Sequence, residues 1–162
     1  MHADYKPADD ILEDRVILVT GAGDGIGRAA AKTYAYHGAT VILLGKTVSK
    51  LEAVYDEIEA AGGPEPAIYP MHMEGAAPHD YEELAHVIDV NFEQLDGILH
   101  NAANMPYLSR IKDYDSEDWM KVMQVNVNAP FLLTQVCLPL LERSGDASIA
   151  FVSCSRSRAT FR

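Results

Sequence analysis

The chain has few cysteines, few basic residues and no long apolar run. Its 162 residues include two cysteines, and 13 lysines and arginines stand against 24 acidic residues, a formal charge of -11. So acidic a chain lacks the basic face that non-specific nucleic-acid binding requires, and we expect no nucleic-acid partner. The length is that of one ordinary domain, and a hydrophobic fraction of 48% is typical of a globular protein with its own core.

The two cysteines and the chain's N-terminal residues also exclude some classes of protein. Cys137 lies in an apolar helical stretch and Cys154 ends a strand-like run, and neither shows metal-ligand spacing such as CxxC. We therefore predict reduced thiols and no metal site. The opening MHADYKPADD has no apolar signal-peptide core, and the apolar stretch 129–141 is too short and interrupted to cross a bilayer. We expect a cytoplasmic protein with no membrane partner.

Short apolar runs alternate with helical patterns along the chain. We predict strands at 15–20, 39–44, 67–71, 95–100 and 147–153, the third weakened by Pro70. We predict helices at 25–37, 49–61, 78–92 and 116–141, the last bent near Pro130. Such alternation implies right-handed crossovers and a doubly wound parallel α/β sheet of the Rossmann type, in the order 3-2-1-4-5. Its ligand crevice would lie beside the first and fourth strands.

The stretch TGAGDGIG, residues 20–27, is rich in glycine and lies between the first strand and the first helix. At this place a parallel sheet binds phosphates, because free N–H groups and the positive helix end point into the crevice. Gly21 would allow the sharp turn, Gly25 the approach of a pyrophosphate, and Gly27 close packing of the helix. Asp24 would repel phosphates, so we expect it to cap the helix instead.

A glycine-rich loop in this position is also compatible with a tight turn that binds nothing, with a P-loop and with a methyltransferase. A P-loop needs GxxxxGK[ST], but the fifth residue after Gly21 is Ile26, and no Lys-Ser or Lys-Thr pair comes directly after it. A methyltransferase shares the fold and a glycine-rich loop after the first strand. It gives no reason for the two later segments LDGILHNA (95–102) and MQVNVNAP (123–130).

These three segments together carry a family resemblance. The spacing TGxxxGIG over 20–27 resembles the cofactor loop of the short-chain dehydrogenase/reductase family. LDGILHNA is similar to its fourth-strand motif, usually NNAG, and MQVNVNAP to the helix that carries a catalytic asparagine. The resemblance covers about residues 14–155 and is closest to the YciK-like bacterial oxidoreductases of that family. It implies a polar lead-in over 1–13, an incomplete, C-terminally truncated NAD(P)-binding domain over 14–155, and a basic tail over 156–162.

The end of the second strand indicates which cofactor is bound. An NAD enzyme usually places an acid there for the ribose 2′-hydroxyl, but this chain has Gly45, Lys46 and Thr47. A small residue, a cation and a hydroxyl suit a 2′-phosphate, so we predict NADP(H) over NAD(H). The predicted cofactor-binding residues are Thr20, Gly21, Asp24, Gly25, Ile26, Gly27, Lys46, Asn101 and Ala102. The family usually has glycine at the position of Ala103. It also often has an aspartate just after the third strand, near the adenine, where the nearest residues of this chain are His72 and Glu74.

The resemblance implies hydride transfer between the nicotinamide and a carbonyl or alcohol of a small molecule. Four groups serve that reaction in the family: a serine, a tyrosine, a lysine and an asparagine. Asn126 matches the asparagine, and Ser155 matches the serine, with Ser153 as the alternative in another register. Full-length relatives are expected to form homo-oligomers.

The tyrosine and lysine of the family's YxxxK motif are missing from these 162 residues. None of the eight tyrosines has a lysine four residues further on. We therefore expect an oxidoreductase by lineage whose 162-residue chain is inactive alone. The alternatives are a non-catalytic NADP(H)-binding module and an inactive gene fragment.

Overall fold

The computed structural model describes residues 6–153, which contain a five-stranded sheet in the order β3-β2-β1-β4-β5. All neighbouring strands run parallel. The strands are β1 (Val16–Thr20), β2 (Thr40–Gly45), β3 (Ala67–Pro70), β4 (Gly97–His100) and β5 (Ser148–Phe151). The predicted doubly wound sheet and its strand order are therefore confirmed.

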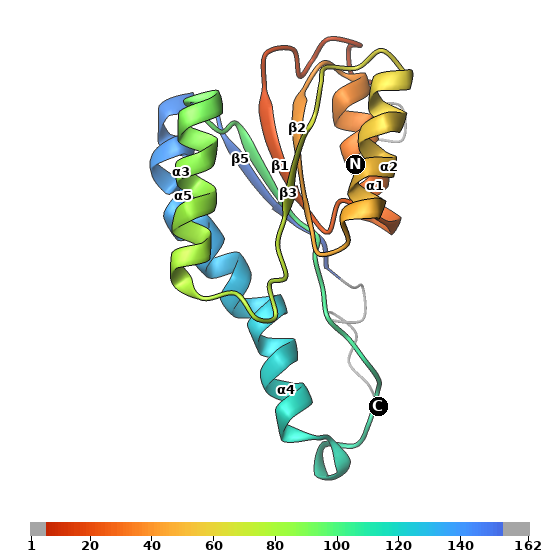
Figure 1. Ribbon diagram of the computed structural model, residues 1–162, viewed down its shortest axis with the longest axis vertical. Coiled ribbons are helices and arrows are strands. Elements are labelled where there is room, and N and C mark those ends of the chain that lie inside the picture. Colours follow the sequence, from red (N-terminus) through yellow and green to blue (C-terminus); the bar gives the residue numbers. More distant parts are fainter. Residues whose placement is uncertain (1–5, 154–162) are drawn as a thin grey trace.

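Helices cover both faces of this sheet (Figure 1). Helices α1 (Gly25–Tyr36) and α2 (Val48–Ala60) lie on one face, and α3 (Pro78–Phe92) and α5 (Ala129–Ser144) on the other. Each pair of helices closes its own hydrophobic cluster against the sheet. Successive residues of β1 point to opposite faces, so Leu18 joins the cluster of α3 and α5. Its neighbours Ile17 and Val19 join the cluster of α1 and α2.

Strand β5 differs from the strands in the middle of the sheet. All five residues of β1 are buried, as an unbroken apolar strand predicts, whereas all four residues of β5 are exposed. Within residues 6–153, β5 pairs with β4 and forms one edge of the sheet. Phe151 at its end keeps 63% of its surface exposed even though its ring stacks on His100 of β4.

The predicted continuous helix over 116–141 is wrong in one respect. The structure has an α-helix, α4 (Ser116–Met123), then a π-helical turn, η2 (Gln124–Asn128), and only then α5. The N–H of Ala129 bonds to the carbonyl of Gln124, five residues back, which widens the turn. Pro130 explains the place, because its ring crowds the carbonyl four residues earlier and it has no N–H to donate. The sequence predicts the disturbance near Pro130, but as a bend and not as a π turn.

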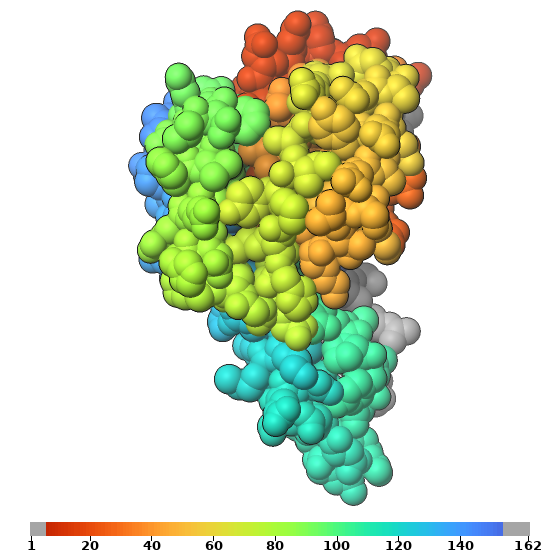
Figure 2. Space-filling model, in the orientation of Figure 1, coloured from red at the N-terminus to blue at the C-terminus, as the bar shows by residue number. Residues whose placement is uncertain are grey.

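The widened turn separates two different environments. Helix α5 buries Leu133 and Cys137 against the sheet, whereas no residue of α4 is buried. In Figures 1 and 2, α4 and the segment before it extend below the sheet as a separate projection. Cys137 is completely buried, and burial raises the pKa of its thiol to about 12.

A buried carboxylate joins the beginnings of β1 and β4. Asp96 accepts hydrogen bonds from the N–H of Val16 at 2.8 Å, the hydroxyl of Ser144 at 2.6 Å and the guanidinium of Arg15 at 3.2 Å. Burial opposes its ionisation, yet the bonds from Ser144, Val16 and Arg15 hold the pKa of Asp96 below its ordinary value. The end of the sheet where β1 and β4 begin is therefore fixed to the end of α5. No helix within residues 6–153 is long and apolar enough to span a membrane.

His100 is a buried titratable group at the carboxyl end of β4. It is 5% exposed, its Nε2 lies 2.9 Å from the hydroxyl of Thr134 in α5, and its ring stacks on Phe151. Burial lowers the pKa of its imidazole to about 4. The folded protein therefore holds a neutral imidazole where the unfolded chain, with a pKa near 6.5, binds a proton.

We predict a loss of stability between pH 6.5 and 4 that depends on His100. The unfolded state binds more protons in this window, so stability falls as pH falls, by up to about 1.4 kcal/mol per pH unit for one proton. Urea unfolding at several pH values measures it, and His100→Asn should flatten the slope. His86→Asn changes an exposed histidine and is the matched control. Equal slopes in the wild type and the His100 variant would contradict the prediction.

Candidate functional site

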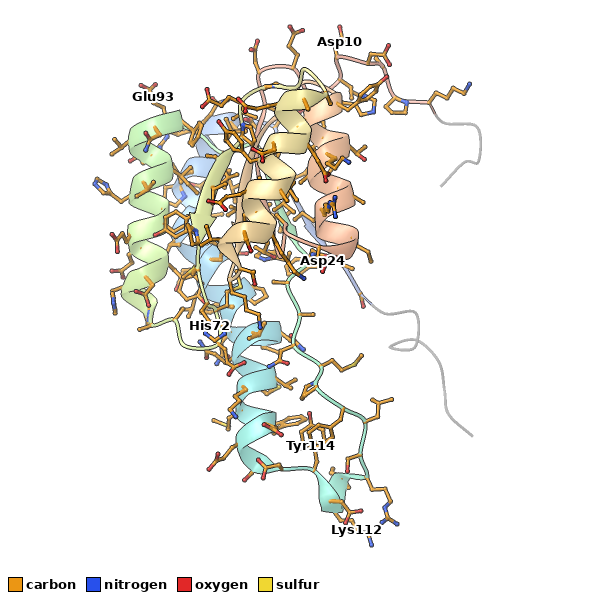
Figure 3. The ribbon with its side chains drawn as sticks, turned by 45° about the vertical axis from the view of Figure 1, so that its right-hand side comes forward. Asp10, Asp24, His72, Glu93, Lys112 and Tyr114 are labelled. Carbon is orange, nitrogen blue, oxygen red and sulfur yellow. The ribbon has the colours of Figure 1, made fainter. Side chains whose placement is uncertain are left out.

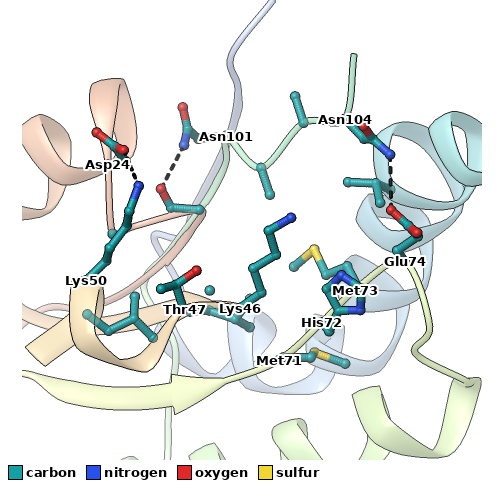
Figure 4. A pocket seen from close by; sticks show the side chains of 18 of the residues that line it. Asp24, Lys46, Thr47, Lys50, Met71, His72, Met73, Glu74, Asn101 and Asn104 are labelled. Atoms are coloured by element: carbon teal, nitrogen blue, oxygen red, sulfur yellow. Dashed lines mark hydrogen bonds and ion pairs between the residues drawn. The ribbon is translucent and has the colours of Figure 1, made fainter. Parts of the chain in front are cut away.

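A cleft of about 470 Å³ opens where the strands end at their carboxyl sides. This is where a doubly wound sheet binds ligands, at the point where the strand order reverses. Its size falls within the range of small-molecule sites. Most of the residues around it come from four loops, those that follow β1, β2, β3 and β4 (Figure 4). Among the predicted cofactor-binding residues, the cleft is lined by Gly21, Asp24, Gly25, Lys46, Asn101 and Ala102.

The glycines after β1 adopt conformations and contacts that other residues cannot adopt easily. Gly21 and Gly25 have φ angles of +66° and +51°, in the left-handed region. A Cβ atom on Gly27 would lie 2.3 Å from the carbonyl oxygen of Gly21, so no side chain fits there. A Cβ on Gly25 would meet nothing within 4 Å. The glycines thus shape a tight turn under α1 and leave the cleft side of Gly25 open.

Thr20, predicted as a cofactor-binding residue, lies behind the cleft and joins two strands. It is 2% exposed, and its hydroxyl accepts hydrogen bonds from the N–H groups of Asn101 at 2.9 Å and Ala102 at 3.0 Å. The hydroxyl in turn lies 3.3 Å from the carbonyl of Leu99, to which it donates. The Asn101 amide donates to the carbonyls of Thr20 at 3.0 Å and Gly21 at 3.3 Å. Thr20, Ile26 and Gly27 are the predicted cofactor-binding residues that do not line the cleft in the described part of the chain.

The loop after β2 carries positive charge and no acid. Gly45 packs so closely on Leu51 that its Cβ would lie 3.1 Å from a Leu51 methyl group. Lys46 is exposed, and Figure 4 shows its side chain reaching into the cleft. Thr47 is the N-cap of α2, but its hydroxyl makes no capping hydrogen bond. The loop therefore offers an ammonium, a hydroxyl and a helix N-terminus to a bound anion.

Asp24 caps α1, as predicted, and also pairs with a lysine of α2 at the edge of the cleft. Its Oδ1 accepts from the N–H of Gly25 at 2.8 Å, and its Oδ2 lies 2.6 Å from Nζ of Lys50 in α2. Lys50 and the Gly25 N–H hold the pKa of the Asp24 carboxyl below its ordinary value. The carboxylate is therefore ionised and joins the glycine loop to α2. Sequence reasoning missed Lys50, because its distance to Asp24 depends on how α1 and α2 pack.

The wall after β3 is formed by Met71, His72, Met73 and Glu74. The two methionines are buried and His72 is exposed beside them. The Glu74 carboxylate accepts from the side-chain amide of Asn104 at 3.2 Å, which links this wall to the loop after β4. Figure 4 shows this pair at the end of the cleft opposite Asp24 and Lys50.

Asn126, the predicted catalytic asparagine, lies in the π turn and holds the loop after β4. Its side-chain oxygen accepts from the N–H of Asn104 at 2.7 Å, and its side-chain nitrogen donates to the Asn104 carbonyl at 2.8 Å. Both polar atoms of the Asn126 side chain thus form hydrogen bonds with the backbone of Asn104. The other predicted catalytic residue, Ser155, lies outside the described residues. Its alternative Ser153 is exposed and follows β5.

Comparison with known proteins gives consistent matches along the chain. A family model described as short chain dehydrogenase matches residues 15–161. The uncharacterized oxidoreductase YciK of Escherichia coli (strain K12) is 46% identical over 154 residues, which are 95% of this chain and 61% of that protein. The chain thus spans about six tenths of the length of this relative.

Solved structures agree with this match. A short chain dehydrogenase from Pseudomonas syringae superposes with a TM-score of 0.93 at 50% identity, over 96% of this chain and 64% of that one. A short chain dehydrogenase from Escherichia coli CFT073, solved in complex with NADPH, gives a TM-score of 0.90 at 47% identity. This second match covers 94% of this chain and 63% of that one.

We predict that the Thr20 hydroxyl is essential for stability. Thr20→Val keeps the shape but leaves the N–H groups of Asn101 and Ala102 without their acceptor, which should cost about 2–4 kcal/mol. Thr20→Ser keeps the oxygen and loses one methyl group, at about 1 kcal/mol. Urea unfolding compares the two variants. If the valine variant is as stable as the serine variant, the hydroxyl does not hold the strands together.

Proposed function

The chain belongs to the short chain dehydrogenase family, and from this we propose that its cleft binds NADP(H) for hydride transfer to or from a carbonyl or alcohol. The observation that carries the proposal is the composition of the cleft. A glycine turn under a helix N-terminus faces a loop that has Lys46 and Thr47 where an NAD site has an acid. The relative solved with NADPH, 47% identical, supports the same cofactor.

In this proposal, three loops contact different parts of the cofactor. The turn at Gly21 and Gly25 would hold the pyrophosphate at the N-terminus of α1, where backbone N–H groups favour anions. Lys46 and Thr47 would bind the 2′-phosphate by charge and hydroxyl. Asn101 and Ala102, fixed by the Thr20 hydroxyl, would form the wall opposite Lys46. A bound nicotinamide supplies the hydride chemistry, and the chain orients it.

The catalytic groups are proposed to be only partly present in these 162 residues. Asn126 would act by positioning the loop at Asn104, which borders the cleft. Ser155 is proposed as the hydroxyl that binds the substrate oxygen, with Ser153 as the alternative. A tyrosine with a lysine four residues later does not occur in the sequence. At neutral pH an unassisted tyrosine, with a pKa near 10, is a poor proton donor or acceptor.

The substrate is proposed to be a small molecule, because the family reaction transfers a hydride to one carbonyl carbon. A cytoplasmic location and assembly of longer relatives into homo-oligomers stay predictions.

We predict that the chain binds NADPH more tightly than NADH through Lys46. Lys46→Gln should weaken NADPH binding by about tenfold, the equivalent of one charged contact, and leave NADH binding unchanged. Calorimetric titration with both nucleotides measures this. Lys112→Gln removes a lysine far from the cleft (Figure 3) and is the matched control for net charge. Equal affinity of the wild type for NADPH and NADH would contradict the cofactor assignment.

We predict that the purified 162-residue chain binds NADPH without oxidising it in the presence of carbonyl substrates. The reason is the missing tyrosine–lysine pair, and the measurement is the absorbance of the reduced nicotinamide over time. Binding without turnover also fits the second candidate, a non-catalytic NADP(H)-binding module. Steady oxidation that disappears in the Asn126→Ala variant would show that the chain is a complete catalyst.

A further inference from the structure

Two lysines of the β2–α2 segment line the cleft, and they differ in the groups that their ammonium ions contact. Lys46 reaches into the cleft from the loop, whereas Lys50, one turn later in α2, is drawn to Asp24 at 2.6 Å (Figure 4). The pair joins the glycine loop to α2 across the edge of the cleft. The glycine loop also packs on the stem of Lys50, since a Cβ on Gly23 would lie 2.9 Å from the Lys50 Cβ.

The ion pair between Asp24 and Lys50 can be replaced by another ion pair at little cost in free energy. The side chains of Lys50 and Asp24 are 55% and 72% exposed, and ion pairs so exposed contribute little to stability. The two partners differ in freedom. Asp24 is fixed by the bond from Gly25 N–H to its other oxygen, whereas the Lys50 ammonium ends a long flexible side chain. A competing anion in the cleft can therefore take Lys50 while Asp24 stays in place.

We propose that Asp24 is an internal competitor for the phosphate charge of the cofactor. It holds Lys50 when the cleft is empty and releases Lys50 to the 2′-phosphate when NADP(H) binds. This inference rests on the proposed function. It explains why an acid lies in a loop that receives phosphates: Lys50 neutralises it in the free protein, and the affinity for NADP(H) is lowered by the cost of separating the pair.

The position of Lys50 favours the 2′-phosphate over the pyrophosphate. Lys50 lies in the first turn of α2, directly above Thr47, and four residues after Lys46. The Thr47 hydroxyl, which makes no capping hydrogen bond, and the backbone of Gly45 line the same side of the cleft. Lys50 therefore serves as a second specificity-determining cation beside Lys46. Asp24 determines how much free energy it costs to transfer the Lys50 ammonium to the 2′-phosphate.

The experiment is calorimetric titration of three single variants with NADPH and NADH. Asp24→Asn keeps the helix cap, because asparagine caps as well as aspartate, and removes the competing charge. We expect it to tighten NADPH binding by about three- to fivefold, within the range of one exposed ion pair, and NADH binding less. Lys50→Gln should weaken NADPH binding by about fivefold or more and NADH binding by less than about twofold.

Glu57→Gln is the matched control. Glu57 also pairs α2 with α1, through Arg28 and Lys32, but away from the cleft, so its loss should change neither affinity by more than about twofold. Circular dichroism checks that each variant is folded.

The outcomes separate the two proposals. Weaker NADPH binding by Asp24→Asn would show that the ion pair stabilises the binding shape of the cleft, and this would overturn the competitor role. Equal losses of NADPH and NADH in Lys50→Gln would overturn the 2′-phosphate assignment. If the folded wild type binds neither nucleotide, the proposed function itself fails.

Discussion

The cleft depends on one buried hydroxyl. Parallel strands separate at their carboxyl ends wherever the strand order reverses, and β1 and β4 are the neighbours at that point. The Thr20 hydroxyl bridges them there by accepting two N–H groups of the chain after β4. Both walls of the cleft begin at this bridge, since Gly21 continues one strand and Asn101 the other. At the opposite end of the sheet Asp96 makes the corresponding connection, so β1 and β4 are fixed at both ends.

Most of the fold could be predicted from the sequence because its local and long-range signals agree. Apolar strands, glycine turns and amphipathic helices each indicate the same parallel sheet, and α3 has the predicted bounds, Pro78–Phe92. The π turn at Gln124–Asn128 could not be predicted in the same way. Pro130 marks where a helix is disturbed, but whether the helix bends or gains a residue depends on what it packs against. Here Asn126 faces the Asn104 backbone, a contact between segments 22 residues apart in sequence.

The cleft residues were predictable where a backbone conformation or a missing charge revealed them. Gly21, Gly25 and Lys46 follow directly from the strand–turn–helix pattern and from the missing acid after β2. The connections around them were not predictable, because Lys50 with Asp24 and Glu74 with Asn104 join different loops. Thr20 is predicted as a contact with the cofactor and is found behind the cleft. Its role is visible only from its hydrogen bonds to the neighbouring strand.

The contact of Gly27 with the carbonyl of Gly21 also bears on the entropy of binding. Because helix and turn touch backbone to backbone, the turn cannot open without moving α1 away from the sheet. The loop that we propose as the pyrophosphate site thus already has its shape in the folded protein. A nucleotide that enters such a preorganised loop does not have to order it, so more of the contact energy remains as affinity. A side chain at position 27 would therefore act on both stability and affinity, since the same packing determines both.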